Sequence, residues 1–429
     1  MDKYEALPLM RGKKPKFFYG YIIVLAGFFI TMVAFGTLFS FGIFFKPLST
    51  ELGLTRAVTS GAYSLSMLSL GLTSIVIGRL SDKFGPRLVV TVCGSFLGLG
   101  YLLMSQLNAI WQLYLFYGVI VGIGMSASFV PLMSTVARWF VKRRGLMTGL
   151  VVSGIGIGGI IMPPIVTQLI SSYGWRISYL ILGIIILVVI IMAAQFLRRD
   201  PGQVAQFPDG QSVVKRGSIL SEVKGFSRQE AIHTRQFWML CAIFLSCFVS
   251  IDIILVHIVP HATDLGISPP IASSILSIIG ALSIVGRIGM GSAGDRIGNK
   301  LALIISFILL AVALFWLLGA KELWMLYLFA AIFGFSYGST SVLMSPTVAD
   351  LFGLRSHGEI LGMVLFGTTI GSAIGPVVVG HIFDITGSYQ LGFLVIAILS
   401  FIGLILVSIL RPTSGQGERS APERSTGLY

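Results

Sequence analysis

Recurrent apolar runs constrain the fold of this chain more than any other feature of its sequence. Twelve runs approach or exceed about 20 residues, the length that a helix needs to cross a bilayer. They lie at residues 19–45, 58–78, 88–106, 110–137, 146–170, 175–197, 237–259, 270–293, 301–319, 323–348, 360–383 and 389–410. Only 11% of the 429 residues are charged, against about a quarter in soluble domains. We therefore expect an all-α membrane protein with twelve transmembrane helices.

Lysine and arginine are concentrated in alternate breaks between these runs. The N-terminal arm, the breaks after the second and fourth runs, residues 198–236 and the C-terminal tail hold most of them. The opposite breaks hold Lys46, Arg56, Arg176 and Lys321. By the positive-inside rule, we expect a protein of the cell membrane (inner or plasma membrane) with both termini in the cytoplasm. This topology and attraction to the lipid bilayer explain the net charge of +13, so we expect no nucleic-acid partner.

The second half of the chain repeats the first at one constant offset, which places Gly78 on Gly291. This offset aligns the turn GRLSDKFGPR with GSAGDRIGNK and the LYLF that begins at Leu113 with the LYLF that begins at Leu326. The matched turn residues are Gly78, Asp82, Lys83, Gly85 and Arg87 with Gly291, Asp295, Arg296, Gly298 and Lys300. Each copy has an even number of spans, so the copies share one orientation. Such parallel repeats are typical of transporters with a solute site between the halves.

The repeat predicts how the chain is divided into domains. Residues 1–197 form an N-terminal six-helix bundle, and residues 237–411 form a C-terminal six-helix bundle. Residues 198–236 are polar and contain prolines and glycines, which is typical of a linker. We expect this linker and the tail, residues 412–429, to be cytoplasmic.

The repeated turn suits a conformational latch. Glycines let two helices approach and the chain reverse, and an aspartate can face a helix N-terminus and paired cations. Such charge contacts are breakable, although a plain positive-inside hairpin would need the same residue types. The pattern G-x-x-x-D-[KR]-x-G-x-[KR], present twice, resembles the cytoplasmic loop signature of the major facilitator superfamily. The resemblance covers nearly the whole chain and implies the major facilitator fold.

Arg287 is the most informative single residue. It lies about 12 Å along a helix from Asp295, at 1.5 Å per residue, so we expect it to be buried in the membrane. Ser277, Gly280, Ser283, Arg287 and Gly291 recur at three- and four-residue steps and form one small, polar stripe. An intramembrane arginine is costly and usually faces a cavity, where its planar fork suits a carboxylate. The alternatives are a structural ion pair or a side chain that reaches the headgroups.

Asp252 and His257 are the ionisable groups of the seventh run. Burial would favour protonation of Asp252, which makes it either a proton carrier or a fixed counter-ion for Arg287. His257 lies about 140° away around the helix and either forms local hydrogen bonds or takes part in proton coupling. Tyr117 and Tyr337 lie deep in the fourth and tenth runs, where they either bind a solute or pack in the core.

No carboxylate and histidine set has the spacing of a metal site. The glycine run at residues 153–159 lacks the strand and the lysine of a phosphate-binding loop. We therefore expect no metal, no cofactor and no enzymatic activity.

Several stretches are similar to the monocarboxylate transporter family and its bacterial relatives. They begin at Tyr19 (YGYIIVLAGFF), Phe41 (FGIFFKPLSTELG), Ala137 (ARWFVKRRGLMTGL), Asp350 (DLFGLRSHGEILG) and His381 (HIFDITGSY). In that family an arginine on helix 8 binds the carboxylate, and Arg287 falls at this place. The resemblance implies proton-linked transport of small monocarboxylates such as lactate or pyruvate.

The chain departs from the animal members of that family at two positions. Ser283 replaces an acidic residue, and Phe39 replaces a lysine of helix 1. At the offset of the repeat, Asp252 on helix 7 corresponds to Phe39, and it is a candidate substitute. The oxalate and formate antiporters are also similar, but they use a second cation on helix 11. Residues 360–383 contain no lysine or arginine, which argues against a small dianion.

We therefore expect an alternating-access carrier that moves a small organic anion together with a proton and works as a monomer. Arg287 and Ser283, with Tyr117 and Tyr337, are the expected substrate-binding residues, and Asp252 or His257 the expected proton-coupling residue. Anion exchange of the oxalate and formate type is the closest alternative. A membrane sensor without transport activity is a remote one.

Overall fold

The computed structural model describes residues 9–11, 17–53, 56–211, 213–215 and 225–411. The N-terminal half contains α1 (Gly20–Phe39), α2 (Phe41–Leu52), α3 (Arg56–Phe84), α4 (Pro86–Met104), α5 (Ile110–Leu113), the π-helix η1 (Tyr114–Val121), α6 (Gly122–Met125), the 3₁₀ turn η2 (Ser126–Ser128), α7 (Val130–Trp139) and α8 (Arg144–Gln195). The C-terminal half contains α11 (Arg235–Asp264), α12 (Pro269–Ile297), α13 (Asn299–Leu317), α14 (Leu323–Phe352), α15 (His357–Thr386) and α16 (Gln390–Ile409).

Short elements lie outside the two bundles. The segment between α8 and α11 contains the 3₁₀ turns η3 (Pro201–Val204) and η4 (Pro208–Gly210), and the short helix α10 (Arg228–Ile232). The strand β1 (Leu9–Arg11) pairs antiparallel with β2 (Val213–Lys215), with Leu9 opposite Lys215. The C-terminal tail, residues 412–429, lies outside the described residues.

The predicted number of spans is confirmed once one long element is divided. In the described part of the chain, 11 helical segments are long and apolar enough to cross a membrane. One of them, α8, has 52 residues and contains Gly174 at φ 76° and ψ 165°, where two crossing helices meet. A positive φ is strained for residues other than glycine. Gly387, the equivalent of Gly174 in the second copy, also has a positive φ of 67°, although its ψ of 14° differs.

The fourth run, residues 110–137, is not one regular helix as its apolar pattern predicts. It is divided into α5, η1, α6, η2 and α7. The last break falls at Phe129, with φ −128° and ψ −65°, just before Pro131 in the first turn of α7. Pro131 has no N–H to donate to the carbonyl oxygen four residues earlier, and its ring clashes with that carbonyl, so a regular helix cannot continue through this point and the chain starts a new helix, α7.

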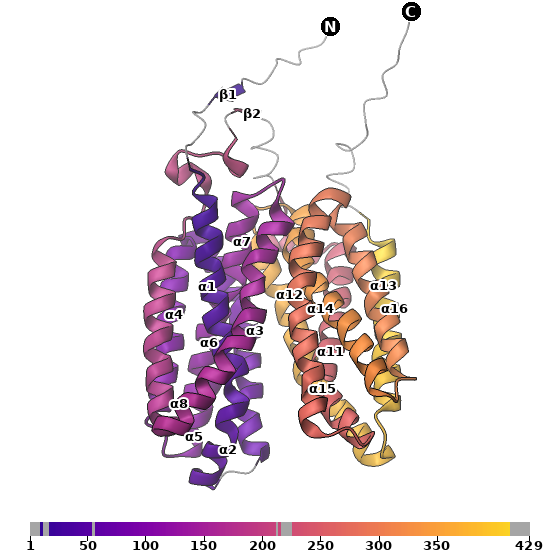
Figure 1. The fold of residues 1–429 in the computed structure, drawn as a ribbon. Coiled ribbons are helices and arrows are strands. Elements are labelled where there is room, and N and C mark those ends of the chain that lie inside the picture. Colours follow the sequence, from indigo (N-terminus) through magenta and orange to yellow (C-terminus); the bar gives the residue numbers. More distant parts are fainter. Residues whose placement is uncertain (1–8, 12–16, 54–55, 212, 216–224, 412–429) are drawn as a thin grey trace, which may run out of the picture.

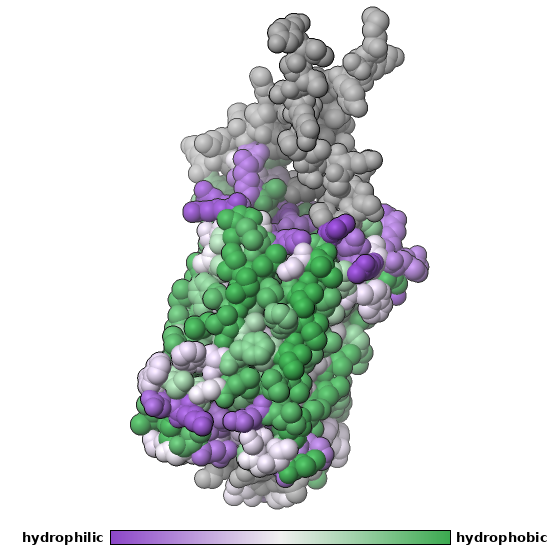
Figure 2. Space-filling model, turned by 90° about the vertical axis from the view of Figure 1, so that its right-hand side faces the viewer, coloured by the Kyte–Doolittle hydropathy of each residue, from purple (hydrophilic) through white to green (hydrophobic). Residues whose placement is uncertain are grey.

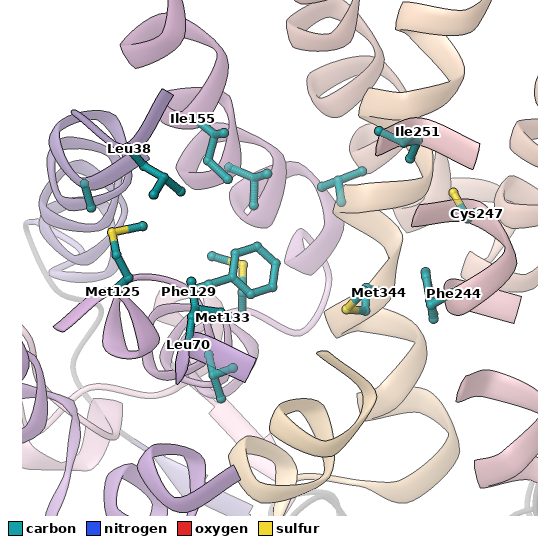
Figure 3. Packing of buried hydrophobic residues seen from close by; sticks show 14 of the residues in the cluster. Leu38, Leu70, Met125, Phe129, Met133, Ile155, Phe244, Cys247, Ile251 and Met344 are labelled. Atoms are coloured by element: carbon teal, nitrogen blue, oxygen red, sulfur yellow. The ribbon is translucent and has the colours of Figure 1, made fainter. Parts of the chain in front are cut away.

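The two halves form adjacent helical bundles, seen in Figure 1 as the indigo-to-magenta and orange-to-yellow parts of the ribbon. Figure 2 shows apolar side chains over the middle of the molecule and polar ones toward its ends. Many of the exposed side chains are large and apolar, such as Met192 (61% exposed) and Val377 (69%), as expected for a surface in contact with lipid. Figure 3 shows buried residues of both bundles, including Leu38 and Met125 in one and Phe244 and Ile251 in the other.

Glycines bring helices of the two halves into backbone contact. A Cβ on Gly145 of α8 would meet the carbonyl oxygen of Gly291 of α12, and a Cβ on Gly78 of α3 would meet that of Gly358 of α15. At the offset of the repeat, Gly78 corresponds to Gly291 and Gly145 to Gly358. The repeat therefore builds two related interfaces, α8 with α12 and α3 with α15.

Small residues also hold α12 against α14. A Cβ on Gly286 would meet the carbonyl oxygen of Phe335, whereas a Cβ on Gly280 of the same helix would meet nothing within 4 Å. We predict that Gly286→Ala lowers the free energy of unfolding by about 1–3 kcal/mol, as overpacking does, and that Gly280→Ala does not lower it. Thermal unfolding of the purified variants in detergent measures both. Equal stability of the two variants would show that the close approach is not required.

Candidate functional site

Arg287 is a buried cation with unused hydrogen-bonding capacity. Its side chain extends from α12, and the residue is 1% exposed. One terminal nitrogen donates a hydrogen bond of 3.1 Å to Ser283 Oγ, one turn earlier. The Nε of Arg287 is buried without a hydrogen-bond partner. Among the described residues, no carboxylate forms an ion pair with Arg287.

Tyr337 of α14 covers the guanidinium group of Arg287. The guanidinium carbon lies 5.0 Å from the centroid of the Tyr337 ring, within the range of a cation–π interaction. The neighbouring Gly338 makes this possible, because a Cβ there would meet the carbonyl oxygen of Ser283. The absence of a side chain at Gly338 therefore lets α14 approach α12 closely enough to place Tyr337 against Arg287.

Asp252 lies on α11 near the same group of residues and is partly buried. Ser372 of α15 lies close to its carboxylate. Tyr337 is close enough to interact electrostatically with both Asp252 and Arg287. Asp252 makes no ion pair with Arg287, so the structure contains no fixed counter-ion at this place among the described residues. Tyr337 thus contacts Arg287 and lies near Asp252.

Tyr63 of the N-terminal half also lies near this site. It lies on α3 and interacts electrostatically with Asp252 and Tyr337 of the other half. Its ring stacks on Phe41, with the ring centroids 5.8 Å apart. The site thus draws side chains from α3 on one side and from α11, α12, α14 and α15 on the other. A single tyrosine in an apolar run carries no sequence signal for such a position.

The other two candidate residues lie in different surroundings. His257 is buried, and its Nε2 lies 2.9 Å from the carbonyl oxygen of Pro376. A carbonyl only accepts, so His257 donates this hydrogen bond to the backbone of α15. Tyr117 is fully buried in the N-terminal bundle, where its ring stacks on Phe41 at 4.2 Å. The Tyr117 hydroxyl has no hydrogen-bond partner, and neither residue contacts Arg287 through a described hydrogen bond or ring contact.

The two aspartates of the repeated turn each cap a helix of the opposite half. The Asp295 carboxylate at the end of α12 accepts hydrogen bonds from the N–H groups of Gly145 (2.6 Å) and Leu146 (2.8 Å). These belong to the first turn of α8. Asp82 Oδ2, at the end of α3, accepts from the N–H of Glu359 (3.2 Å) in the first turn of α15. A carboxylate at a helix N-terminus satisfies free N–H groups and interacts favourably with the helix dipole.

The cations that join this network come from outside the repeated turn. One terminal nitrogen of Arg138, on α7, lies 3.2 Å from Asp82 Oδ1. The same nitrogen donates a 2.8 Å hydrogen bond to the carbonyl oxygen of Leu354 in the other half. Arg144 forms an ion pair with Asp350, with 3.7 Å between a terminal nitrogen and Oδ1, and this pair also joins the two halves.

The cations of the turn itself point elsewhere. A terminal nitrogen of Arg87 donates a 2.7 Å hydrogen bond to the side-chain oxygen of Gln195. The Nζ of Lys83 lies 5.1 Å from the centroid of the Phe84 ring. Arg296 and Lys300 are exposed. Gly85 and Gly298 have φ values of 87° and 89°, which residues with a side chain rarely adopt. In this structure the turn therefore contributes its aspartates and its glycines to the contact between the halves, and its four cations lie outside that contact.

All of these contacts between the halves lie at the end of the bundles where α3 and α12 end and where α8 and α15 begin, the upper end in Figure 1. We predict that the double variant Asp82→Ala, Asp295→Ala opens this end. Loss of an N-cap costs about 0.5–2 kcal/mol, so each site should shift the open–closed equilibrium by about twofold to thirtyfold. The distance between spin labels at the exposed positions Lys83 and Arg355, measured by pulsed electron paramagnetic resonance, should increase.

The matched control is Asp264→Ala. Asp264 is an exposed carboxylate at the opposite end of the C-terminal bundle, and its removal should leave the distance distribution unchanged. An unchanged distribution in the Asp82 and Asp295 double variant would mean that the two caps do not hold this end closed.

Comparisons with known proteins identify the family. The sequence family described as "Major Facilitator Superfamily" matches residues 27–288 and 251–427. The chain is 28% identical to the uncharacterized MFS-type transporter YhjX of Escherichia coli strain K12, over 82% of this chain and 85% of that protein. It is 28% identical to monocarboxylate transporter 13 of Rattus norvegicus (90% and 87% covered). It is 26% identical to the oxalate:formate antiporter of Oxalobacter formigenes (92% and 92%).

The fold has a counterpart among solved structures. The major facilitator superfamily proton:xylose symporter XylE superimposes with a TM-score of 0.70, over 92% of this chain and 97% of that one, at 14% identity. At this identity the likeness concerns the fold alone. Family match, relatives and fold agree, and the chain belongs to the major facilitator superfamily of membrane transporters.

Proposed function

We propose that the protein is a proton-coupled symporter of small monocarboxylates that works by alternating access. The observation that carries this proposal is the state of Arg287, which is buried, lacks a carboxylate partner among the described residues and retains a free Nε. A buried cation without a counter-ion is unfavourable, so an anionic ligand would stabilise it. Relatives named as monocarboxylate transporters and as an oxalate:formate antiporter support the same class of substrate.

The surroundings of Arg287 favour a single carboxylate. A guanidinium group can donate two parallel hydrogen bonds to a carboxylate, while Ser283 holds one of its nitrogens and Tyr337 covers its face. The helix α15, which packs on α3, contains no lysine or arginine that would bind a second carboxylate. A small dianion such as oxalate would therefore leave one charge without a partner. This favours lactate-sized monocarboxylates over dianions.

Asp252 is the proposed proton carrier. It lies within the membrane-spanning helix α11 and makes no ion pair with Arg287. Tyr337 interacts with both residues, so a substrate on Arg287 would change the electrostatic surroundings of Asp252. The role in proton coupling that the sequence suggested for His257 is less favoured, because its Nε2 already donates to a backbone carbonyl.

The remaining features of the carrier follow from the same proposal. Residues 1–197 and 237–411 would be the two moving bundles, joined by the linker at residues 198–236. The protein would work as a monomer in the cell membrane with cytoplasmic termini. The end that is closed by Asp82 and Asp295 would then be the cytoplasmic end, and the structure would represent a carrier closed to the cytoplasm.

An uptake panel tests the substrate class. Purified protein in liposomes should accumulate L-lactate and pyruvate, and each should compete with the other. Xylose, a neutral solute, and choline, a cation, should not compete, and oxalate should compete weakly. Liposomes without protein are the control. If neutral or cationic solutes compete and lactate-sized acids do not, the proposed substrate class is wrong.

A further inference from the structure

A second basic site lies on the N-terminal bundle, away from Arg287. A cavity of about 740 Å³ is bounded by the start of α4 and by the end of α8 with the residues that follow it. Its lining includes Arg87, Arg198, Arg199, Gln195, Phe84 and Leu88. The cavity lies at the same end as the contacts of Asp82 and Asp295, but neither aspartate lines it. None of the proposed steps of transport uses it.

The three arginines of the cavity are poorly neutralised. Arg87 donates two hydrogen bonds, of 3.0 and 2.7 Å, to the neutral amide oxygen of Gln195. Arg198 donates to two backbone carbonyl oxygens, those of Gln195 and Leu197. The Nε of Arg199 lies 3.3 Å from Asp200 but is buried without a hydrogen-bond partner. Asp200 is itself shared with Arg138, at 3.6 Å.

The N-terminus of α4 adds hydrogen-bond donors to the same cavity. This helix has 19 residues and begins at Pro86, after Gly85 with a φ of 87°, and no side chain caps it. The first N–H groups of a helix have no acceptor within the helix, and they form the positive end of its dipole. Arg87 and Leu88, in this first turn, both line the cavity. Three arginines and an uncapped helix N-terminus thus border one cavity, and both are features of sites that bind phosphate.

An apolar track leads from the cavity along the outside of α4. Leu88, Val92, Phe96 and Leu99 follow one another at three- and four-residue steps, with exposed fractions of 56%, 47%, 43% and 45%. Phe84 at the rim is 55% exposed. A ligand with a phosphate in the cavity would therefore have its apolar part against this helix, within the bilayer. A phospholipid would occupy both the basic cavity and the apolar track, whereas a free phosphate would occupy only the cavity.

The C-terminal half does not repeat this arrangement. At the offset of the repeat, Arg87 and Arg198 correspond to Lys300 and Arg411, but Gln195 corresponds to Ser408 and Arg199 to Pro412. The site is therefore particular to one half and is not a general consequence of positive charge in cytoplasmic loops.

We propose that this cavity binds the phosphate-bearing headgroup of an anionic phospholipid, with an acyl chain along α4. Basic pockets between membrane helices are suited to such headgroups. Binding at this place joins the start of α4 to the end of α8 through the lipid, in addition to the Arg87–Gln195 hydrogen bonds.

Native mass spectrometry of the purified protein with added phosphatidylglycerol tests the proposal. The double variant Arg87→Gln, Arg199→Gln should bind this lipid roughly tenfold more weakly or worse, since each basic residue contributes substantially to binding of anionic lipid. The control Lys142→Gln, Arg143→Gln removes the same charge from exposed positions of the same half and should bind normally. Phosphatidylcholine should bind poorly to all three proteins.

Two further measurements distinguish a lipid headgroup from free phosphate and provide a test that does not depend on folding of the arginine variant. Inorganic phosphate at millimolar concentration should not displace the lipid. Leu88→Ser, an exposed change, should weaken lipid binding even if the arginine variant does not fold. Any of three results would overturn the proposal. They are equal lipid binding by the two double variants, full displacement of the lipid by inorganic phosphate, and normal lipid binding by Leu88→Ser.

Discussion

Arg287→Ala should abolish carboxylate uptake while the protein still folds. The variant removes the buried guanidinium group that, in our proposal, receives the substrate carboxylate. Truncating one partner of a buried, hydrogen-bonded charge pair costs about 2–5 kcal/mol, so affinity should fall by roughly 30-fold to several thousandfold. Initial rates of lactate uptake into proteoliposomes, over a range of lactate concentrations, measure the loss.

Arg287→Lys tests whether a positive charge is sufficient for carboxylate binding or whether the planar guanidinium group is required. Lysine keeps a positive charge but cannot offer two parallel donors to a carboxylate, so we expect it to fail as well. Lys321→Ala is the control, because it removes an exposed cation outside the site and should leave uptake at the wild-type level. The gel-filtration profile in detergent checks folding. Near-normal uptake by Arg287→Ala would exclude the proposed binding role.

Asp252→Asn should separate carboxylate transport from the proton gradient. An asparagine has similar size but cannot carry a proton, so a pH gradient should no longer drive accumulation. In the wild type, a gradient of one pH unit provides about 1.4 kcal/mol, or up to tenfold accumulation for one proton per carboxylate. The variant should lose this stimulation but still exchange internal for external lactate, because Arg287 is intact.

The control for this experiment is on the same helix. Asp264 lies at the exposed end of α11, and Asp264→Asn should keep the response to the gradient. If Asp252→Asn accumulates lactate as strongly as the wild type in a pH gradient, another group carries the proton.

Most of the fold could be predicted from the sequence because it depends on features that are local or repeated. Apolar length alone indicates a membrane-spanning helix, and Gly174 falls in the break between the fifth and sixth runs. The offset of the repeat predicts that Gly78 and Gly291 are equivalent positions. The structure shows that each lies at a contact between the halves, with Gly358 and Gly145. The irregular fourth span was not predicted, because hydropathy does not register the effect of Pro131.

The site could be predicted only in part, because it depends on contacts between distant segments. Arg287 was identifiable, since a cation is rare inside an apolar run. The involvement of Tyr63 depends on how α3 packs against α15 of the other half, which no local pattern describes. The same holds for Arg138, which pairs with Asp82 in place of the cations of the turn itself. The position of Tyr63 is set by packing between the two bundles, and the Arg138–Asp82 pair by packing within the N-terminal bundle.

The comparisons limit the proposal to the level of the substrate class. Relatives at 26% and 28% identity are named an oxalate:formate antiporter and a monocarboxylate transporter, respectively. The chain itself supplies the distinction that we draw between them. It has one buried arginine on α12 and no lysine or arginine on α15, and a carboxylate, Asp252, lies close enough to Tyr337 to interact with it electrostatically.

Simultaneous measurement of lactate and protons in one preparation tests the central proposal most directly. Proteoliposomes without any internal carboxylate would receive external lactate, while an internal pH dye and labelled lactate are followed together. We predict that lactate enters and that the interior becomes more acidic in step with it, and that both signals disappear in Arg287→Ala. Entry only after the vesicles are preloaded with a carboxylate, with no change in internal pH, would contradict proton-coupled symport.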